Sequence, residues 1–110
     1  MILQVMRERY LRDPLPVRLG GLAADLARVV SFSDDLTSRK AVTSLLEEGK
    51  YFVEWAAPEA PLDVQALLAE LQISLAVWQR RWVAGRPDPM MRTEAQRWSD
   101  QLLELSGLTT

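Results

Sequence analysis

The sequence predicts an all-α fold: an up-and-down four-helix bundle with a short additional N-terminal helix, forming a single helical-bundle domain over residues 1–110. Three observations support this prediction. Proline and glycine divide the chain into segments, these segments show helical hydrophobic periodicity, and no convincing alternating strand pattern occurs. Connections of about three to six residues favour antiparallel neighbouring helices. A chain of 110 residues has room for one domain.

The first two predicted helices are separated by the segment DPLP at residues 13–16. The first helix covers about residues 3–11 and ends there, because two prolines cannot continue a helix. The second covers residues 17–32, with Pro16 suited to its first turn. Its apolar stripe consists of Leu19, Leu22, Leu26 and Val29. Its opposite side, which we expect to face solvent, carries Arg18, Asp25 and Arg28.

The third predicted helix covers about residues 35–56 and follows a polar cap at residues 33–35 (SDD). Acidic side chains in this position suit the positive end of a helix dipole. Gly49 continues the apolar stripe that begins at Leu45, so we expect another helix to approach closely there. Pro58 ends the helix.

The fourth predicted helix begins near residue 62, ends at a C-cap glycine, Gly85, and is the most apolar segment of the chain. Its clearly polar positions form one line, Gln65, Gln72 and Gln79. Apolar side chains cover more than one of its faces: Leu67, Leu68, Leu71, Ile73, Leu75, Val77 and Trp78. Because such a helix must be buried on several sides, we expect the first helix or a partner to cover it.

The fifth predicted helix begins near Met91 and ends before Gly107. Its apolar side chains have heptad-like spacing: Met91, Ala95, Trp98, Leu102 and Leu105.

Two absences in the composition exclude large classes of chemistry. The chain contains no histidine and no cysteine. This excludes catalytic triads and dyads built on imidazole or thiol, disulfides, and nearly every zinc, copper, haem or iron–sulfur site. With 13 basic and 15 acidic side chains, the chain has neither a polybasic arm nor an acidic tail. We therefore expect a protein that is not an enzyme, with no catalytic residue, cofactor or metal.

Carboxylates are the remaining candidates for chemistry. The pair at residues 47–48 (EE) is interpreted as a solvated helix face, and the pair at residues 34–35 (DD) as a helix cap. Glu70 lies within an apolar helix and is expected to face water, the alternative being a buried carboxylate with a partner.

Arginine and tryptophan gather between residues 78 and 98. Guanidinium groups beside indole rings can stack on bases or bind phosphate and carboxylate groups. Trp78 and Trp82 continue a leucine stripe, so core packing is the favoured interpretation of these two side chains. The candidate contacts for a partner or an anion are Arg80, Arg81, Trp82, Arg86, Arg92 and Arg97. The same arginines are equally suited to internal ion pairs with Asp88, Glu94 and Asp100.

A further interpretation concerns residues 38–55. In this segment LLEEG followed by YFV resembles the recognition helix and wing of winged-helix regulators. No basic excess surrounds the helix, and Pro58 and Pro61 arrive too early for a second wing strand. DNA binding depends heavily on phosphate neutralisation, so this interpretation is disfavoured.

Three runs carry a resemblance to a known family: YLRDPLPVRLGGLAADLARVVSFS, LLEEGKYFVEWAAPE and RWSDQLLELSGL. Together they resemble a family of small cyanobacterial helical proteins of unknown function. The resemblance implies a cytoplasmic, single-domain protein. It implies no activity, ligand or site residue.

Two apolar runs bear on the compartment of the protein. The N-terminal apolar run is too short for a signal-peptide core and residues 71–79 are too short to span a bilayer, so we expect a cytoplasmic protein. The leading hypothesis is a non-enzymatic protein-interaction or scaffold module that contacts a protein partner or forms a homodimer. The alternative hypothesis is anion or nucleic-acid binding through the cluster at residues 78–98.

Overall fold

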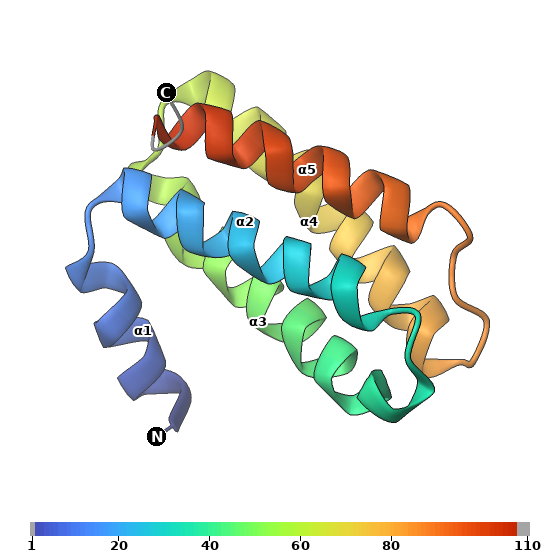
Figure 1. The fold of residues 1–110 in the computed structure, drawn as a ribbon. Helices are drawn as coiled ribbons and strands as arrows, with labels where there is room; N and C mark the ends of the chain where they lie inside the picture. Colours follow the sequence, from blue (N-terminus) through green and yellow to red (C-terminus); the bar gives the residue numbers. More distant parts are fainter. Residues whose placement is uncertain (1, 108–110) are drawn as a thin grey trace.

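The computed structural model describes residues 2–107, and this part of the chain contains five α-helices and no strand (Figure 1). The helices are α1 (Ile2–Arg12), α2 (Leu15–Phe32), α3 (Arg39–Ala56), α4 (Leu62–Val83) and α5 (Met91–Ser106). Two 3-10 turns, Leu36–Ser38 and Ala57–Glu59, lie on either side of α3. The prediction of an all-α fold is confirmed, and each helix lies close to its expected range.

Proline and acidic residues set the helix starts. Pro14 and Pro61 have extended backbones and stand directly before α2 and α4, where a missing N–H leaves no hydrogen bond unmade. The Asp35 carboxylate accepts hydrogen bonds from the backbone N–H and the hydroxyl of Thr37, at 2.9 and 2.7 Å. The predicted cap therefore serves the 3-10 turn, and α3 begins at Arg39.

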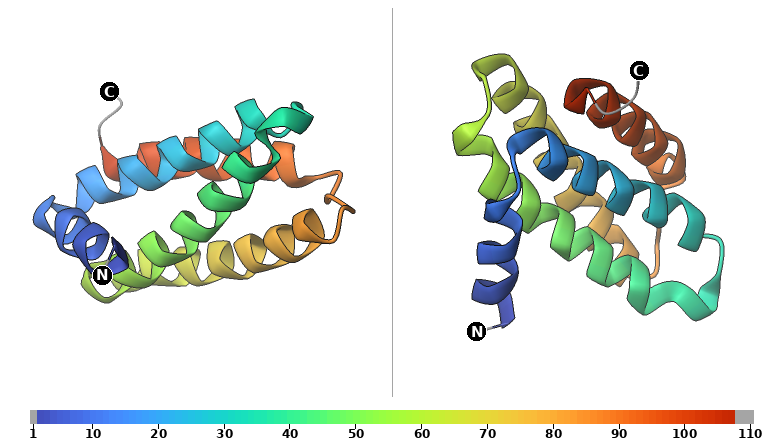
Figure 2. Two further views of the ribbon diagram at one scale, coloured as in Figure 1. Left: turned by 90° about the horizontal axis from the view of Figure 1, so that it is seen from below. Right: turned by 60° about the vertical axis from the view of Figure 1, so that its left-hand side comes forward.

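The helices α2 and α3 lie at the centre of the arrangement. The helix α2 packs along both α3 and α5, and α3 packs along both α2 and α4 (Figures 1 and 2). Although α5 follows α4 in the sequence, its main packing partner is α2. The helix α1 extends away from the other four and contacts α3 (Figure 2).

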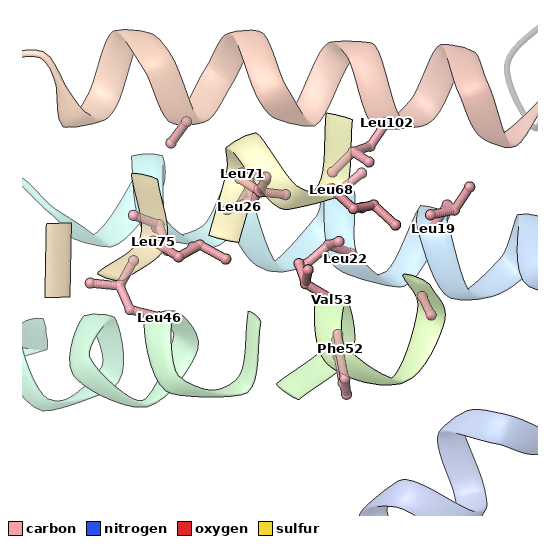
Figure 3. Close-up of a cluster of buried hydrophobic side chains, with 14 of the residues drawn as sticks. Leu19, Leu22, Leu26, Leu46, Phe52, Val53, Leu68, Leu71, Leu75 and Leu102 are labelled. Carbon is pink, nitrogen blue, oxygen red and sulfur yellow. The ribbon is translucent and has the colours of Figure 1, made fainter. Parts of the chain in front are cut away.

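The hydrophobic core lies where α2, α3, α4 and α5 face one another (Figure 3). Its largest fully buried side chains include Trp78, Leu22, Leu26, Leu46, Leu68, Leu71, Leu75 and Leu102. Gly49 of α3 lies against two of them, because a Cβ at this position would be 3.5 Å from Leu75 and 3.8 Å from Leu22. The predicted close approach at Gly49 is confirmed.

The position of α1 is fixed by its last turn. The Tyr10 ring stacks on Phe52 of α3, with 4.0 Å between centroids and an interplanar angle of 2°. The Tyr10 hydroxyl donates a hydrogen bond of 3.0 Å to the backbone carbonyl of Arg18. Arg18 in turn donates from Nε to the Asp13 carbonyl at 3.0 Å, and its Nη1 lies 2.5 Å from the Glu59 carboxylate. These contacts tie α1, the start of α2 and the end of α3 together.

One prediction about α2 is wrong. Arg18 and Asp25 were expected in solvent, but the structure leaves them only 4% and 3% exposed. The reason is the central position of α2, which is covered on two sides and at its start, so its buried arc is wider than the leucine stripe. Arg28 does lie in solvent, as expected.

Candidate functional site

The predicted arginine cluster lies mainly at one end of the molecule, where the loop at residues 84–90 joins α4 to α5. Two of its members form internal ion pairs. Arg81 lies 3.3 Å from Asp88, and Arg92 lies 2.8 Å from Asp34 in the connection after α2. Arg80 and Arg86 are exposed and make no ion pair within the described residues. The structure thus divides the cluster into structural and free members.

The fifth arginine of the cluster lies apart from the others. Arg97 lines a surface groove of about 400 Å³ between α4 and α5, together with Glu70, Glu94 and Trp98. Glu70 is exposed there, as predicted. Two carboxylates in the same groove make it a poor binding site for an anion.

The tryptophans at the end of α4 serve the core. Trp78 is 1% exposed and Trp82 is 8% exposed, so the prediction of core packing is confirmed for both. The Trp82 indole Nε1 donates a hydrogen bond of 3.1 Å to the carbonyl of Arg39, and the Arg39 guanidinium donates to the carbonyls of Trp82 and Val83. Trp82 therefore ties the end of α4 to the start of α3.

The glutamine line of α4 faces α3. Gln65 and Gln72 donate to the carbonyls of Ala57 and Lys50, at 2.8 and 3.1 Å. Gln79 donates to Glu47 and accepts a hydrogen bond of 2.9 Å from Lys50. The polar line is thus a seam between two helices, and Glu47, half-buried, belongs to this seam rather than to a fully solvated face.

A buried carboxyl group that the sequence did not predict lies between α2 and α3. Burial, followed by the neighbouring Glu48 carboxylate, raises the pKa of Asp25 to about 8, and its ion pair with Arg28 at 2.9 Å only partly offsets this. Two carboxyl groups can share a hydrogen bond only if one holds a proton. With its pKa raised to about 8, the protonated form of Asp25 predominates at neutral pH, and this form can donate a hydrogen bond to Glu48.

A second apolar line runs along α4 on the side away from the core. Ile73 is 68% exposed and Leu62 is 81% exposed. The line has the alternating four- and three-residue spacing of a coiled-coil seam. We call it the outward face of α4, and it consists of Leu62, Ala66, Ala69, Ile73, Ala76, Arg80 and Val83.

The outward face is uncovered along its whole length by the described residues. All of its members are exposed, and α4 forms one edge of the molecule (Figure 2). Of the two expected covers for α4, the first helix or a partner, the first helix is the wrong one, because α1 packs on α3 through Tyr10. The composition of α4 predicted a helix that is apolar on more than one face, but not that its apolar residues form two separate lines. Two series of apolar residues run along α4 with the same spacing, offset by two residues, which is about 200° around the helix axis. This offset would have predicted a second apolar seam.

Charge is distributed unevenly along α4. Its acidic side chains, Asp63 and Glu70, lie in the N-terminal half, and its basic side chains, Arg80 and Arg81, lie in the last turns. This arrangement favours the helix dipole. The dipole does not account for exposed apolar side chains between the charges.

Similarity to known proteins gives no information on function, so a functional proposal rests on the fold and on the sites described above. No family model matches the chain, and no curated protein or solved structure matches it. The resemblance to small cyanobacterial proteins therefore stays a prediction. Within residues 2–107 no cluster of three or more acidic side chains could hold a metal ion, and no helix there combines the length and apolar character needed to cross a membrane.

Proposed function

We propose that the chain is a non-enzymatic interaction module, a four-helix bundle with an additional N-terminal helix that self-associates through the outward face of α4. The observation that carries this proposal is the exposure of Ile73 and its neighbours along a helix whose other side is already packed in the core. Contiguous exposed apolar surface of this kind marks contact sites on proteins. The cytoplasm stays the expected compartment, and the cysteine-free composition is compatible with it.

The composition of the outward face supports contact with another helix. Alanines at positions 66, 69 and 76 allow two helix axes to approach to about 8 Å, the lower end of the usual range. Larger side chains between them, Ile73 above all, can insert into the spaces that alanine leaves.

The proposal is tested by the mass of the particle in solution. Size-exclusion chromatography with light scattering at micromolar concentration is expected to give a dimer for the wild-type chain and a monomer for Ile73→Glu. Val17→Glu is the matched control, because Val17 is an exposed apolar residue on α2. This control is expected to stay dimeric. A monomeric wild-type protein, or a dimeric Ile73→Glu variant, would overturn the proposal.

Anion binding is a second candidate function, and the free guanidinium groups of Arg80 and Arg86 favour it. It predicts salt-dependent binding of single-stranded nucleic acid that Arg86→Ala weakens. Arg86 lies beyond α4, so this variant leaves the outward face intact. Absence of binding at low salt would contradict this candidate.

A further inference from the structure

We infer that two copies of the chain pair antiparallel through α4, with Arg80 of each copy beside Glu70 of the other. This inference rests on the proposed function and specifies its partner, orientation and register. It follows from the distribution of charge along α4 and from the sizes of the side chains on its outward face.

The charge pattern selects the orientation. In a parallel pair each residue lies level with the same residue of the second copy, so Glu70 would lie beside Glu70 and Arg80 beside Arg80. In an antiparallel pair the acidic N-terminal half of α4 lies against the basic C-terminal half of the second copy. Like charges repel and unlike charges attract across a helix interface, so the antiparallel pair is favoured.

The side-chain sizes select the register. With Ile73 level with Ala76 of the second copy, Arg80 lies level with Ala69 and Val83 with Ala66. Each of these layers joins one alanine to one larger side chain, as close helix packing requires. A slip that sets Ile73 level with Ala69 loses this match, because Ala66 then meets Ala76.

The same register brings opposite charges together. Arg80, level with Ala69 of the second copy, is one residue, or about 1.5 Å along the axis, from the level of Glu70. The twofold symmetry produces this contact twice. In the slipped register the two copies of Glu70 would instead lie side by side near the twofold axis. Charge and size therefore favour the same arrangement.

Disulfide cross-linking tests the orientation, and the absence of native cysteine makes the result easy to interpret. Ala66→Cys and Val83→Cys are made as separate single variants with tags of different mass, mixed, and treated with oxidised dithiothreitol. The expected product is a disulfide between position 66 of one variant and position 83 of the other. Neither variant alone is expected to cross-link. Thr93→Cys, on the exposed surface of α5, measures cross-linking by random collision.

The outcomes separate this inference from the proposed function. Cross-links within Ala66→Cys alone and within Val83→Cys alone would show a parallel pair, which overturns the orientation and leaves self-association through α4 intact. A monomeric wild-type chain, or dimers that persist in Ile73→Glu, would overturn both. Mixed cross-links no more frequent than those of Thr93→Cys would overturn the register.

A charge exchange tests the contact between Arg80 and Glu70. Arg80→Glu is expected to weaken the dimer roughly tenfold, because it creates two repulsive contacts. Combining it with Glu70→Arg exchanges the charges and is expected to restore the affinity to within about threefold of wild type. Lys40→Glu, an exposed charge reversal at the start of α3, is the control and should have no effect. A double variant as weak as Arg80→Glu alone would overturn the contact.

Discussion

The helices α2 and α4 are both rich in leucine, yet their burial is opposite in character. On α2, two ionisable side chains, Arg18 and Asp25, are almost completely buried. On α4, two large aliphatic side chains, Ile73 and Val77, are exposed. The difference comes from the number of neighbours, because α2 packs along α3 and α5 while α4 packs along α3. Burial in this protein follows a helix's place in the arrangement as much as its own residues.

This comparison also separates two uses of the same residue type. Leucines on the inner side of α4 are buried in the core, whereas the large aliphatic residues on its outward face are exposed. Substitutions on both helices and at their contacts test this difference in burial.

The largest effect is expected from Leu75→Ala, because Leu75 is 0% exposed. Loss of its side chain leaves a cavity between α2, α3 and α4, and the free energy of unfolding should fall by about 2–5 kcal/mol. Ile73→Ala, two residues away on the outward face, should change it by less than about 0.5 kcal/mol. Urea unfolding, at concentrations low enough to keep the chain monomeric, measures both. Similar losses in the two variants would contradict the division of α4 into an inner and an outward side.

A smaller effect is expected from Asp25→Asn, and it depends on pH. The pKa of Asp25 is near 3.8 in the unfolded chain and is raised to about 8 in the fold, so the folded chain binds the proton more tightly. The stability from this proton is fully present below about pH 4 and is lost as the pH rises towards 8. We expect wild type to lose stability across this window, by at most about 1.4 kcal/mol per pH unit, and Asp25→Asn to lose less, because the amide keeps a donor for Glu48 without titrating.

Urea unfolding of wild type and Asp25→Asn at about pH 5 and pH 8 checks this expectation. Arg28→Gln is a useful companion, since removal of the ion pair at 2.9 Å from Asp25 should raise the pKa of Asp25 further and steepen the loss. Equal pH dependence in wild type and Asp25→Asn would show that the Asp25 carboxyl does not keep its proton in the fold.

The smallest effect is expected from Gly49→Ala, at the point where α3 contacts both α2 and α4. The added methyl group would lie 3.5 Å from Leu75, which is ordinary van der Waals contact. Alanine also restricts the unfolded chain more than glycine does. The free energy of unfolding should therefore rise by about 0.5–1 kcal/mol, visible as a higher melting temperature. A lower melting temperature would indicate that the three helices are too tightly packed here for any added atom.

The sequence predicts the helices well because their ends depend on local chemistry. Pro14 and Pro61 stand before α2 and α4, and Gly107 follows α5 with a φ of 70°, each within its own few residues. The burial of Trp78 was also predictable, because leucines precede it at helical spacing. Asp25 was not predictable in this way. Its burial requires α3 to cover one side of α2, and this tertiary contact cannot be inferred from the spacing of residues within α2.

The candidate site was predicted only in part for the same reason. Free and paired arginines look alike in sequence, and Asp34, the partner of Arg92, is distant along the chain. The proposed role of Arg80 rests on its place on the outward face and not on the arginine cluster. Its neighbours on that face are apolar and exposed rather than basic. The apolar content of α4 suggested a partner, but its heptad order became meaningful only when the inner side was known to be filled.

The stacking of Tyr10 on Phe52 has a consequence for the motions of the chain. Because α1 is held by the contacts of Tyr10 with Phe52 and Trp55, by the packing of Met6 and by bonds around Arg18, its opening requires the loss of few contacts and few hydrogen bonds. Local opening of α1 should therefore cost much less free energy than global unfolding. Its backbone amides should exchange with deuterium well before those of α2, and Tyr10→Ala should accelerate that exchange while leaving the slowest amides of α2 unchanged.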